Sequence, residues 1–267
     1  MKKVMMAVIL MLMANMVIAG DKIMMEGSTT VLPIAQIAAE VYMDENPDVD
    51  ITVRGGGSGV GAASLVDGSC DIADCSRPLK EKELKAAVAN GIDPVAHVVA
   101  MDGIAVILHP SKSIDAMTKD QIKAIYTGSI SNWSKLGEEK QEIVVISRDT
   151  ASGTYEAFNG LALDKAKVRP DALLQASNQA VASIVAKTPG AIGYVGLGYV
   201  TSKVKAVTVD DVVCEKETIL SGEYPLSRPL FMYTDGKPKG ILKEFLDFIK
   251  SEEGQALAEE AGFVGLK

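Results

Sequence analysis

The sequence predicts an α/β protein with a mostly parallel sheet, and three observations carry this prediction. Short apolar runs, such as residues 49–53 and 143–146, alternate with amphipathic segments of helical period, such as residues 240–250. This alternation is typical of parallel sheets that are covered by helices. Of the 267 residues, 48% are hydrophobic, 5% are aromatic and 24 are glycine, which suits a sizeable core joined by tight turns.

The loop after the predicted strand 143–146 is the first candidate functional element. Ser152, Gly153 and Thr154 stand where this loop turns into a helix. The first N–H groups of a helix have no intrahelical partner and carry the positive end of the helix dipole, so they form an anion site. Arg148 adds a planar guanidinium suited to oxyanions. The competing interpretation is a helix cap beside a surface arginine.

The turn after the first predicted strand has a similar composition. Ser28, Thr29 and Thr30 follow the apolar residues 23–25 and precede a predicted helix at 32–41. Either Ser28 or Thr29 is expected to cap this helix. The turn is therefore a second place where hydroxyls meet a helix N-terminus, and its competing interpretation is a good capping sequence and nothing more.

Two further junctions carry glycine and hydroxyl groups. The cluster at residues 55–61 contains Ser58 and Gly59, and its glycines let the backbone approach a ligand closely. The cluster matches neither the dinucleotide-binding pattern, nor the P-loop, nor the nucleophile elbow. Ser76 and Arg77 follow the next predicted strand. Because ligands of such sheets lie beyond the carboxyl ends of the strands, four such junctions predict a convergent oxyanion site.

The remaining segments follow from the same patterns. Residues 95–108 are mostly apolar with Gly103 near the middle, which predicts a pair of strands with a glycine break, crossing between two domains. Further helices are predicted at 80–88, 118–126, 155–163, 181–187, 240–250 and 252–260, and an extended segment at 224–233.

Residues 1–20 are predicted to be a signal peptide. Lys2 and Lys3 precede an apolar stretch at 4–17, and small residues near Gly20 offer a cleavage point. The stretch is shorter than the roughly 20 residues of a spanning helix, although an uncleaved anchor is the alternative. No cysteine stands at the cleavage point, so we expect no lipid anchor. The mature protein is expected in the periplasm or another extracytoplasmic compartment.

The charge balance is acidic. The formal net charge is −8, and loss of Lys2 and Lys3 with the signal peptide gives −8 − 2 = −10. This balance argues against nucleic acid and anionic membranes as partners. A small anion is still compatible with it, because backbone dipoles and a single arginine act locally.

Cysteine and histidine offer little chemistry. Cys70 and Cys75 could close a short disulfide loop in an oxidising compartment and leave Cys214 free, or all three could be ordinary small buried residues. His97 and His109 are expected to be structural. Without cysteine or histidine at ligand spacing, the sequence predicts no metal site, and we expect no cofactor.

Six motifs together resemble one family. They lie at residues 27–33, 55–61, 71–78, 148–154, 192–195 and 224–233, in the family's order, and the resemblance extends over nearly all of the mature chain. The sequence is similar to the type II periplasmic binding proteins that carry phosphate to ABC-type importers. The resemblance implies a monomer that binds inorganic phosphate and meets a membrane permease.

The resemblance also implies two lobes and a ligand site. Each lobe would be a mostly parallel sheet flanked by helices, one made of residues 21–103 and 223–267 and the other of residues 104–222, with dehydrated phosphate in the cleft. The implied phosphate-binding residues are Ser28, Thr29, Thr30, Ser58, Gly59, Ser76, Arg148, Ser152, Gly153 and Thr154. Ser76 stands where some members carry an aspartate that accepts the phosphate proton. The acceptor could instead be Asp74, Asp149 or a main-chain carbonyl, and Asp149 could also only pair with Arg148.

Other functions stay open at this point. Sulfate, molybdate or tungstate could replace phosphate as the ligand. A secreted phosphatase would need a metal cluster or an activated nucleophile with a base, and two scattered histidines supply neither, so no enzyme is expected. A sensing role that retains phosphate binding has the same sequence pattern as transport.

Overall fold

The computed structural model describes residues 20–266, so the predicted signal peptide lies outside the described residues except for Gly20. The strands are β1 (Asp21–Gly27), β2 (Val49–Gly55), β3 (Ile72–Cys75), β4 (Pro94–Leu108), β5 (Ala116–Met117), β6 (Val144–Arg148), β7 (Leu173–Gln175), β8 (Ala191–Gly196), β9 (Lys205–Ala206), β10 (Thr208–Val209) and β11 (Ser227–Asp235). The helices are α1 (Leu32–Glu45), α2 (Ser58–Val66), α3 (Glu81–Ala89), α4 (Lys119–Thr127), α5 (Gly153–Leu161), α6 (Asn178–Val185), α7 (Lys216–Ser221), α8 (Gly240–Lys250) and α9 (Glu252–Glu260), with short 3-10 turns at Trp133–Leu136 and Leu197–Tyr199.

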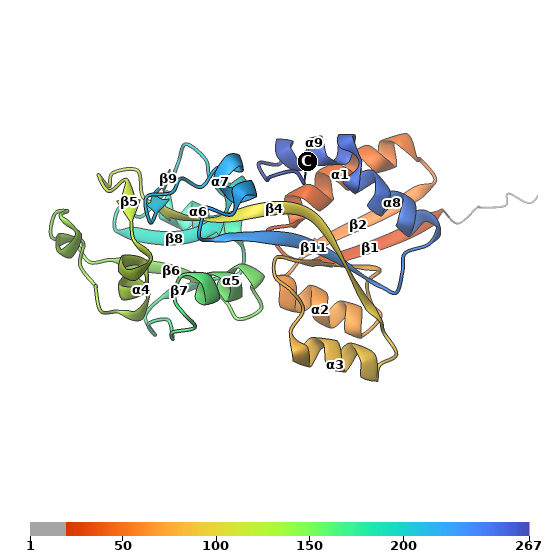
Figure 1. The fold of residues 1–267 in the computed structure, drawn as a ribbon, viewed down its shortest axis with the longest axis horizontal. Coiled ribbons are helices and arrows are strands. Elements are labelled where there is room, and N and C mark those ends of the chain that lie inside the picture. The colour runs from red at the N-terminus through yellow and green to blue at the C-terminus, as the bar shows by residue number, and fades with distance from the viewer. Residues whose placement is uncertain (1–19, 267) are drawn as a thin grey trace, which may run out of the picture.

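A nine-stranded sheet runs through the described part of the chain, and β5 and β10 form a separate two-stranded sheet. The strand order of the nine-stranded sheet is β2-β1-β3-β11-β4-β8-β6-β7, with β9 paired to β4. Parallel pairs join β1 to β2 and β3, and β6 to β7 and β8. The long strands β4 and β11 are antiparallel to each other and cross between the two halves of the molecule (Figure 1). The α/β class predicted from the sequence is confirmed, and the antiparallel pairs occur where the halves are joined.

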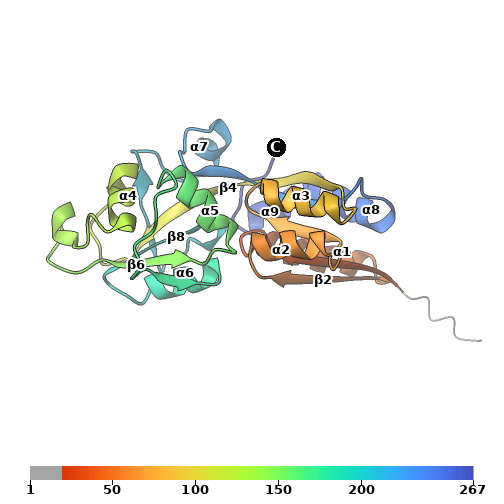
Figure 2. The same ribbon diagram turned by 90° about the horizontal axis from the view of Figure 1, so that it is seen from below.

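Each half buries its own core on both faces of the sheet. In one half, α1, α8 and α9 lie on one side of β1 and β2, and α2 and α3 lie on the other (Figure 1). In the other half, α4 and α5 lie on one side of β6 and β8, and α6 lies on the other (Figure 2). A buried layer on both faces is what a mostly apolar strand run requires.

The predicted glycine break in the segment 95–108 is wrong. Strand β4 is continuous through Gly103, and it pairs with β11 up to Gly103 and with β8 from Ile104 onward. A Cβ at Gly103 would lie 2.4 Å from Cys214 Sγ and 2.8 Å from Ile219 Cδ1, so the missing side chain leaves room for close packing. Gly103 therefore marks a place where the side chains of Cys214 and Ile219 approach the strand closely, and not the end of a strand.

Two helices begin earlier than their apolar pattern predicted. Helix α5 begins at Gly153, with Ser152 as its cap, and α6 begins at Asn178, with Ser177 as its cap. In each case the serine hydroxyl accepts a hydrogen bond from the third helical N–H. The first turn of each helix carries polar residues, which is why periodicity alone placed both starts too late.

The cysteines are free thiols. Cys70 and Cys75 are both buried and form no disulfide with each other, so the buried-residue alternative holds for this pair. Burial raises the pKa of Cys70 to about 12, which makes it a poor nucleophile at neutral pH. No group of three metal-ligating side chains occurs within residues 20–266.

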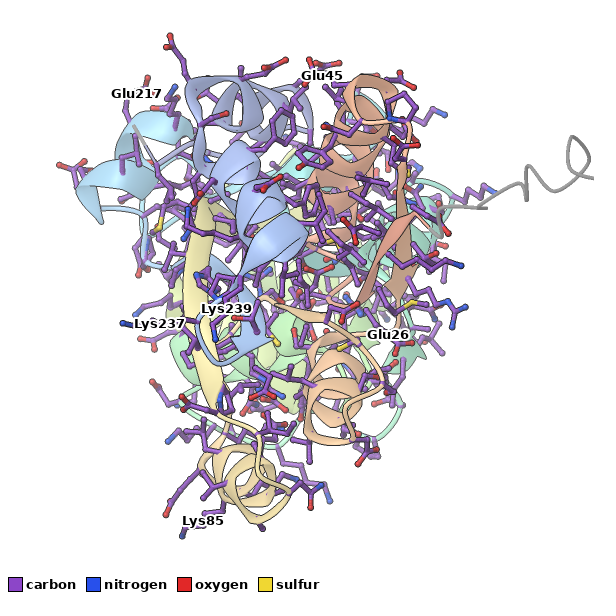
Figure 3. All side chains as sticks on the ribbon, turned by 90° about the vertical axis from the view of Figure 1, so that its right-hand side faces the viewer. Glu26, Glu45, Lys85, Glu217, Lys237 and Lys239 are labelled. Atoms are coloured by element: carbon purple, nitrogen blue, oxygen red, sulfur yellow. The ribbon has the colours of Figure 1, made fainter. Side chains whose placement is uncertain are left out.

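Many charged side chains lie on the outer surface. Figure 3 shows charged side chains that project outward, among them Glu45 on α1, Lys85 on α3 and Glu217 on α7. In the part of the chain that the structure describes, no helix combines the length and the apolar character needed to cross a membrane.

Candidate functional site

Arg148 closes strand β6 and is held rigidly. Its main-chain N–H donates to the hydroxyl of Tyr194 at 3.1 Å, its Nε donates to Gln175 O at 3.0 Å and its Nη2 donates to Ala176 O at 2.9 Å. The side chain is 2% exposed, and burial lowers the pKa of its guanidinium, which remains a cation at neutral pH. Nη1 is buried and has no hydrogen-bond partner among residues 20–266. A fixed cation with one free donor is suited to receive an anion.

Asp149 does not neutralise that cation by direct pairing. Its Oδ1 accepts from Ala151 N at 2.9 Å and so shapes the loop before α5. The alternative that Asp149 only pairs with Arg148 is wrong, because no ion pair joins them within the described residues, although the charge of Asp149 favours the protonated guanidinium.

The N-terminus of α5 lies next to this arginine. Ser152 caps the helix through its hydroxyl, which leaves Gly153 and Thr154 as the first two helical residues. Their N–H groups form no hydrogen bond with residues 20–266. All three residues are buried. The loop-to-helix junction predicted from the sequence is therefore a buried set of donors.

The turn between β1 and α1 supplies hydroxyls from the other half of the molecule. Ser28 Oγ accepts from Thr30 N at 3.1 Å, so Ser28 stabilises the turn before α1, whose N-cap position is Val31. Thr29 and Thr30 are 7% and 0% exposed. Neither predicted cap therefore occupies the cap position, and Thr29 and Thr30 keep their hydroxyls for contacts beyond this turn.

The glycine loop brings the two halves into contact. Gly57 has a φ of +98°, and a Cβ there would lie 2.7 Å from Ala151 O in the other half. The N–H of Gly59 donates to that same carbonyl at 2.9 Å, so in this conformation it is already used. Ser58 Oγ accepts from Ser76 N at 2.9 Å and thereby fixes two predicted site residues against each other.

Hydroxyls from both halves converge on one buried cluster. Thr30 Oγ1 and Thr154 Oγ1 are hydrogen-bonded at 2.9 Å, and Ser58 Oγ and Ser76 Oγ lie 3.3 Å apart. A Cβ at Gly153 would be 2.2 Å from Ser58 Oγ and 2.6 Å from Ser76 Oγ, so α5 begins against that pair. Of the predicted residues, Ser28 and Ser152 stabilise the turns next to the cluster through their hydroxyls. The other predicted residues belong to the cluster or surround it.

Replacement of Gly153 by alanine is expected to force the two halves apart. The new methyl group would overlap the Ser58 and Ser76 hydroxyls, and overpacking of this kind costs about 1–3 kcal/mol. The free energy of unfolding should fall by that amount in urea titrations. The matched control is Gly160→Ala on the same helix, where an added Cβ meets nothing within 4 Å. Equal stability of the two variants would contradict this packing.

Sequence reasoning missed Arg228. This residue lies on the crossing strand β11, is 5% exposed, and donates through Nε and Nη2 to Asp102 Oδ2 at 2.9 and 2.8 Å. Its Nη1 donates to Ser76 O at 3.1 Å, and its Nη2 lies 3.3 Å from Thr30 Oγ1 and 3.1 Å from Thr154 Oγ1. One guanidinium thus contacts both halves and the crossing strand β4.

Sequence reasoning also missed Asn178. The residue is fully buried at the start of α6, and its Nδ2 donates to Thr29 Oγ1 at 3.1 Å and to Thr30 Oγ1 at 3.0 Å. A signal existed for both missed residues. Arg228 lies inside the extended motif 224–233, and Ser177–Asn178 is a fifth strand-to-helix junction of the predicted kind.

Two buried carboxyl groups lie near this cluster. Burial raises the pKa of Asp102, and the guanidinium of Arg228 opposes that rise. Asp74 on β3 is 0% exposed, and neither of its carboxyl oxygens has a hydrogen-bond partner among residues 20–266. Burial raises the pKa of Asp74 well above its usual 3.8.

Replacement of Asp74 by asparagine is expected to flatten the pH dependence of stability. The native pKa of Asp74 lies above the unfolded value, so its contribution to stability is full below pH 3.8 and is lost as the pH rises through the native pKa. The loss amounts to about 1.4 kcal/mol per pH unit in that window. Urea titrations from pH 4 upward should show the wild type losing stability relative to Asp74→Asn. A constant difference across this range would contradict a raised pKa.

Charged side chains form the rim between the halves. Arg77 donates to Glu83 Oε1 and Oε2 at 2.8 Å within one half, and its Nε lies 2.5 Å from Glu156 Oε2 of α5 in the other half, an ion-pair contact without hydrogen-bond geometry. Lys80 also pairs with Glu156. The guanidinium of Arg77 is therefore paired with carboxylates, whereas the guanidinium of Arg148 contacts only main-chain carbonyl groups among the described residues.

The two histidines lie outside the hydroxyl cluster. Its hydroxyls contact one another, the main-chain N–H of Ser76 and the guanidinium of Arg228, and neither histidine joins it. His97 Nε2 pairs with Thr234 Oγ1 at 3.0 Å, and His109 Nδ1 pairs with Ser111 Oγ at 2.8 Å, both away from the cluster. No hydroxyl of the cluster is thus bonded to a histidine that could activate it as a nucleophile.

Comparisons with known proteins agree with the fold. The family model described as a PBP superfamily domain matches residues 19–253. The phosphate-binding protein PstS of Bacillus subtilis is 38% identical over 251 residues, which cover 92% of this chain and 81% of that protein. PstS of Staphylococcus epidermidis is 33% identical over 253 residues, covering 90% of this chain and 77% of the relative.

Solved structures give the same result. A phosphate ABC transporter substrate-binding protein from Clostridium perfringens, solved with bound phosphate, is 33% identical with a TM-score of 0.85, and the match covers 92% of this chain and all of that one. An ABC-type phosphate transport receptor from Vibrio cholerae is 31% identical with a TM-score of 0.74, covering 91% and 99% of the two chains. This chain therefore belongs to the PBP superfamily, in the same family as the PstS proteins.

Proposed function

We propose that this protein binds inorganic phosphate outside the cytoplasm and delivers it to the membrane permease of an ABC-type importer. The observation that carries the proposal is the buried cluster of hydroxyls at the N-terminus of α5, in a chain whose Arg148 also buries a donor, Nη1, without a partner among residues 20–266. Such a set of fixed donors stabilises a desolvated oxyanion. The names of the family members and the bound phosphate of the Clostridium protein support phosphate as that anion.

The bound phosphate would contact donors from both halves. Arg148 Nη1, the N–H groups of Gly153 and Thr154 and the hydroxyls of Thr29, Thr30, Ser58, Ser76 and Thr154 are the proposed ligands. Ser28, Gly59 and Ser152 would act by shaping the turns that hold these donors. The hydroxyl of Ser76 can accept or donate a hydrogen bond. The candidates for the group that receives the phosphate proton are therefore Ser76, Asp74, Asp149 and a main-chain carbonyl.

The two halves are proposed to be the lobes of a clamp. Residues 21–103 with 223–267 would form one lobe and residues 104–222 the other, and the crossing strands β4 and β11 would contain the hinge. The contacts of Thr30 with Thr154 and of Gly59 with Ala151 join the proposed lobes, which supports the closed state as the conformation of this structure. A monomer is sufficient for such a site, because one chain supplies every proposed ligand.

Phosphate is expected to close this clamp in solution. Because donors from both lobes contact one ligand, the ligand favours the closed state by its differential affinity. Small-angle scattering of the mature protein should show a smaller radius of gyration at saturating phosphate than without it. A radius that does not change on saturation would count against a hinged clamp.

Calorimetry tests the proposed ligand. The mature wild-type protein should bind inorganic phosphate and bind sulfate and molybdate more weakly. Equal binding of sulfate would reject phosphate as the specific ligand. Incubation with a generic phosphomonoester tests the enzyme alternative. Release of phosphate above the uncatalysed rate would show that the protein is a phosphatase and would reject the assignment as a receptor.

A further inference from the structure

The carboxylate of Glu156 contacts only the opposite half of the molecule. Glu156 lies in the first turn of α5, and its side chain is 21% exposed. Its Oε2 lies 2.5 Å from Nε of Arg77, and its Oε1 pairs with Nζ of Lys80. Both cations belong to the segment that joins β3 to α3. Among residues 20–266, this carboxylate forms no hydrogen bond or ion pair with its own half.

Glu83 holds Arg77 in place for this contact. Its carboxylate accepts hydrogen bonds from Nη1 and Nη2 of Arg77, each at 2.8 Å, and from the main-chain N–H of Lys80 at 2.8 Å. The two outer nitrogens of the guanidinium are thus held within one half, and Nε faces Glu156. Arg77, Lys80 and Glu83 together carry a net charge of 2 − 1 = +1, opposite the single negative charge of Glu156. The charges on the two sides of the boundary therefore attract each other.

These ion pairs join two segments that carry proposed phosphate donors. Arg77 directly follows Ser76 in the chain, and Glu156 follows Thr154 by two positions. The two segments are close, because a Cβ added at Gly153 would lie 2.6 Å from Ser76 Oγ. Beside the ion pairs, a cavity of about 430 Å³ with mostly apolar walls lies between α5, the segment after β3 and the crossing strand β11. The ion pairs therefore span a part of the boundary where side-chain packing is incomplete.

We propose that Glu156 is a positioning residue that holds the two halves closed over bound phosphate and thereby sets the rate at which phosphate is released. The proposal rests on the proposed function, because it assumes phosphate in a clamp of two lobes. The ion pairs form only when the halves are together, so they stabilise the closed state relative to the open state. Opening must break them before the ligand leaves, whereas the encounter of phosphate with the open state does not involve them. Loss of the pairs should therefore accelerate release more than it changes association.

The release rate of phosphate tests this role. Radiolabelled phosphate bound to the mature protein is chased with excess unlabelled phosphate. We expect Glu156→Gln to release it about threefold faster than the wild type, because a partly exposed ion pair contributes modestly. If the charge of Glu156 acted only by repelling the nearby anion, its removal would slow release instead. The matched control is Glu217→Gln, which removes an exposed carboxylate from the first turn of α7 and should release phosphate like the wild type.

A second substitution identifies ion pairing as the cause. Lys80→Met removes one of the two cations and should release phosphate about twofold faster than the wild type. Combined with Glu156→Gln, it should add nothing, because the carboxylate that pairs with Lys80 is already absent. Additive effects would mean that the two side chains act independently, and would reject the ion pairs as the cause.

The outcomes separate this inference from the proposed function. If the wild type retains no phosphate, the proposed function fails, and the inference fails with it. If the wild type binds phosphate but Glu156→Gln releases it no faster, the role of Glu156 is rejected and the proposed function stands. Should Glu156→Gln not fold, as judged by its melting temperature, Lys80→Met decides the question, and an unchanged release rate in that variant rejects the inference.

Discussion

Replacement of Arg228 by alanine is expected to destabilise the protein by about 3–5 kcal/mol. The carboxylate of Asp102 is 0% exposed and receives two hydrogen bonds from this guanidinium, so removal of Arg228 leaves a buried charge without its partner. The same substitution also removes the contacts to Ser76, Thr30 and Thr154. Urea denaturation can be followed through the fluorescence of the single tryptophan, Trp133, which is buried.

Two further variants show whether the buried charge causes the loss. Adding Asp102→Asn to Arg228→Ala should recover part of the stability, because the remaining side chain is neutral. Arg54→Ala removes an exposed arginine from β2 and should change stability by less than about 0.5 kcal/mol. A cost of Arg228→Ala as small as that of Arg54→Ala would contradict the importance of the ion pair.

Replacement of Arg148 by alanine is expected to weaken phosphate binding about ten- to hundredfold. The estimate follows from the roughly 1.5–3 kcal/mol of a hydrogen bond to a charged group, here the one that Nη1 would donate to phosphate. Arg148→Lys should recover only part of the affinity, because an ammonium cannot keep the bonds to Gln175 O and Ala176 O and also direct a donor at the ligand. Calorimetry of each variant with inorganic phosphate measures both effects.

Arg77 is the comparison for this prediction. Its guanidinium is held by Glu83 and Glu156, so Arg77→Ala should affect the rim between the halves and leave most of the affinity in place. If Arg77→Ala abolished phosphate binding while Arg148→Ala bound like the wild type, the assignment of Arg148 would be wrong. Melting temperatures of both variants show whether a loss of binding reflects a loss of folded protein.

The sequence by itself determined the fold class and the places where donors occur. Strand-to-helix junctions are local patterns, since a few residues of apolar run, turn and cap specify them. The buried positions of Thr30, Ser58 and Thr154 follow from such junctions meeting at one edge of the sheet. Their contact with phosphate remains a prediction that the calorimetric experiments test.

Only the tertiary structure decided how these donors are supported. Arg228 faces Asp102 because β11 and β4 pair in antiparallel register with these two residues opposite each other, although 126 positions separate them in the chain. Asn178 reaches Thr29 and Thr30 across the boundary between the halves. Local patterns carry no information on strand register or on which helix start faces which turn, because long-range packing sets both. For the same reason the structure, and not the glycine in the sequence, showed that β4 crosses between the halves without a break.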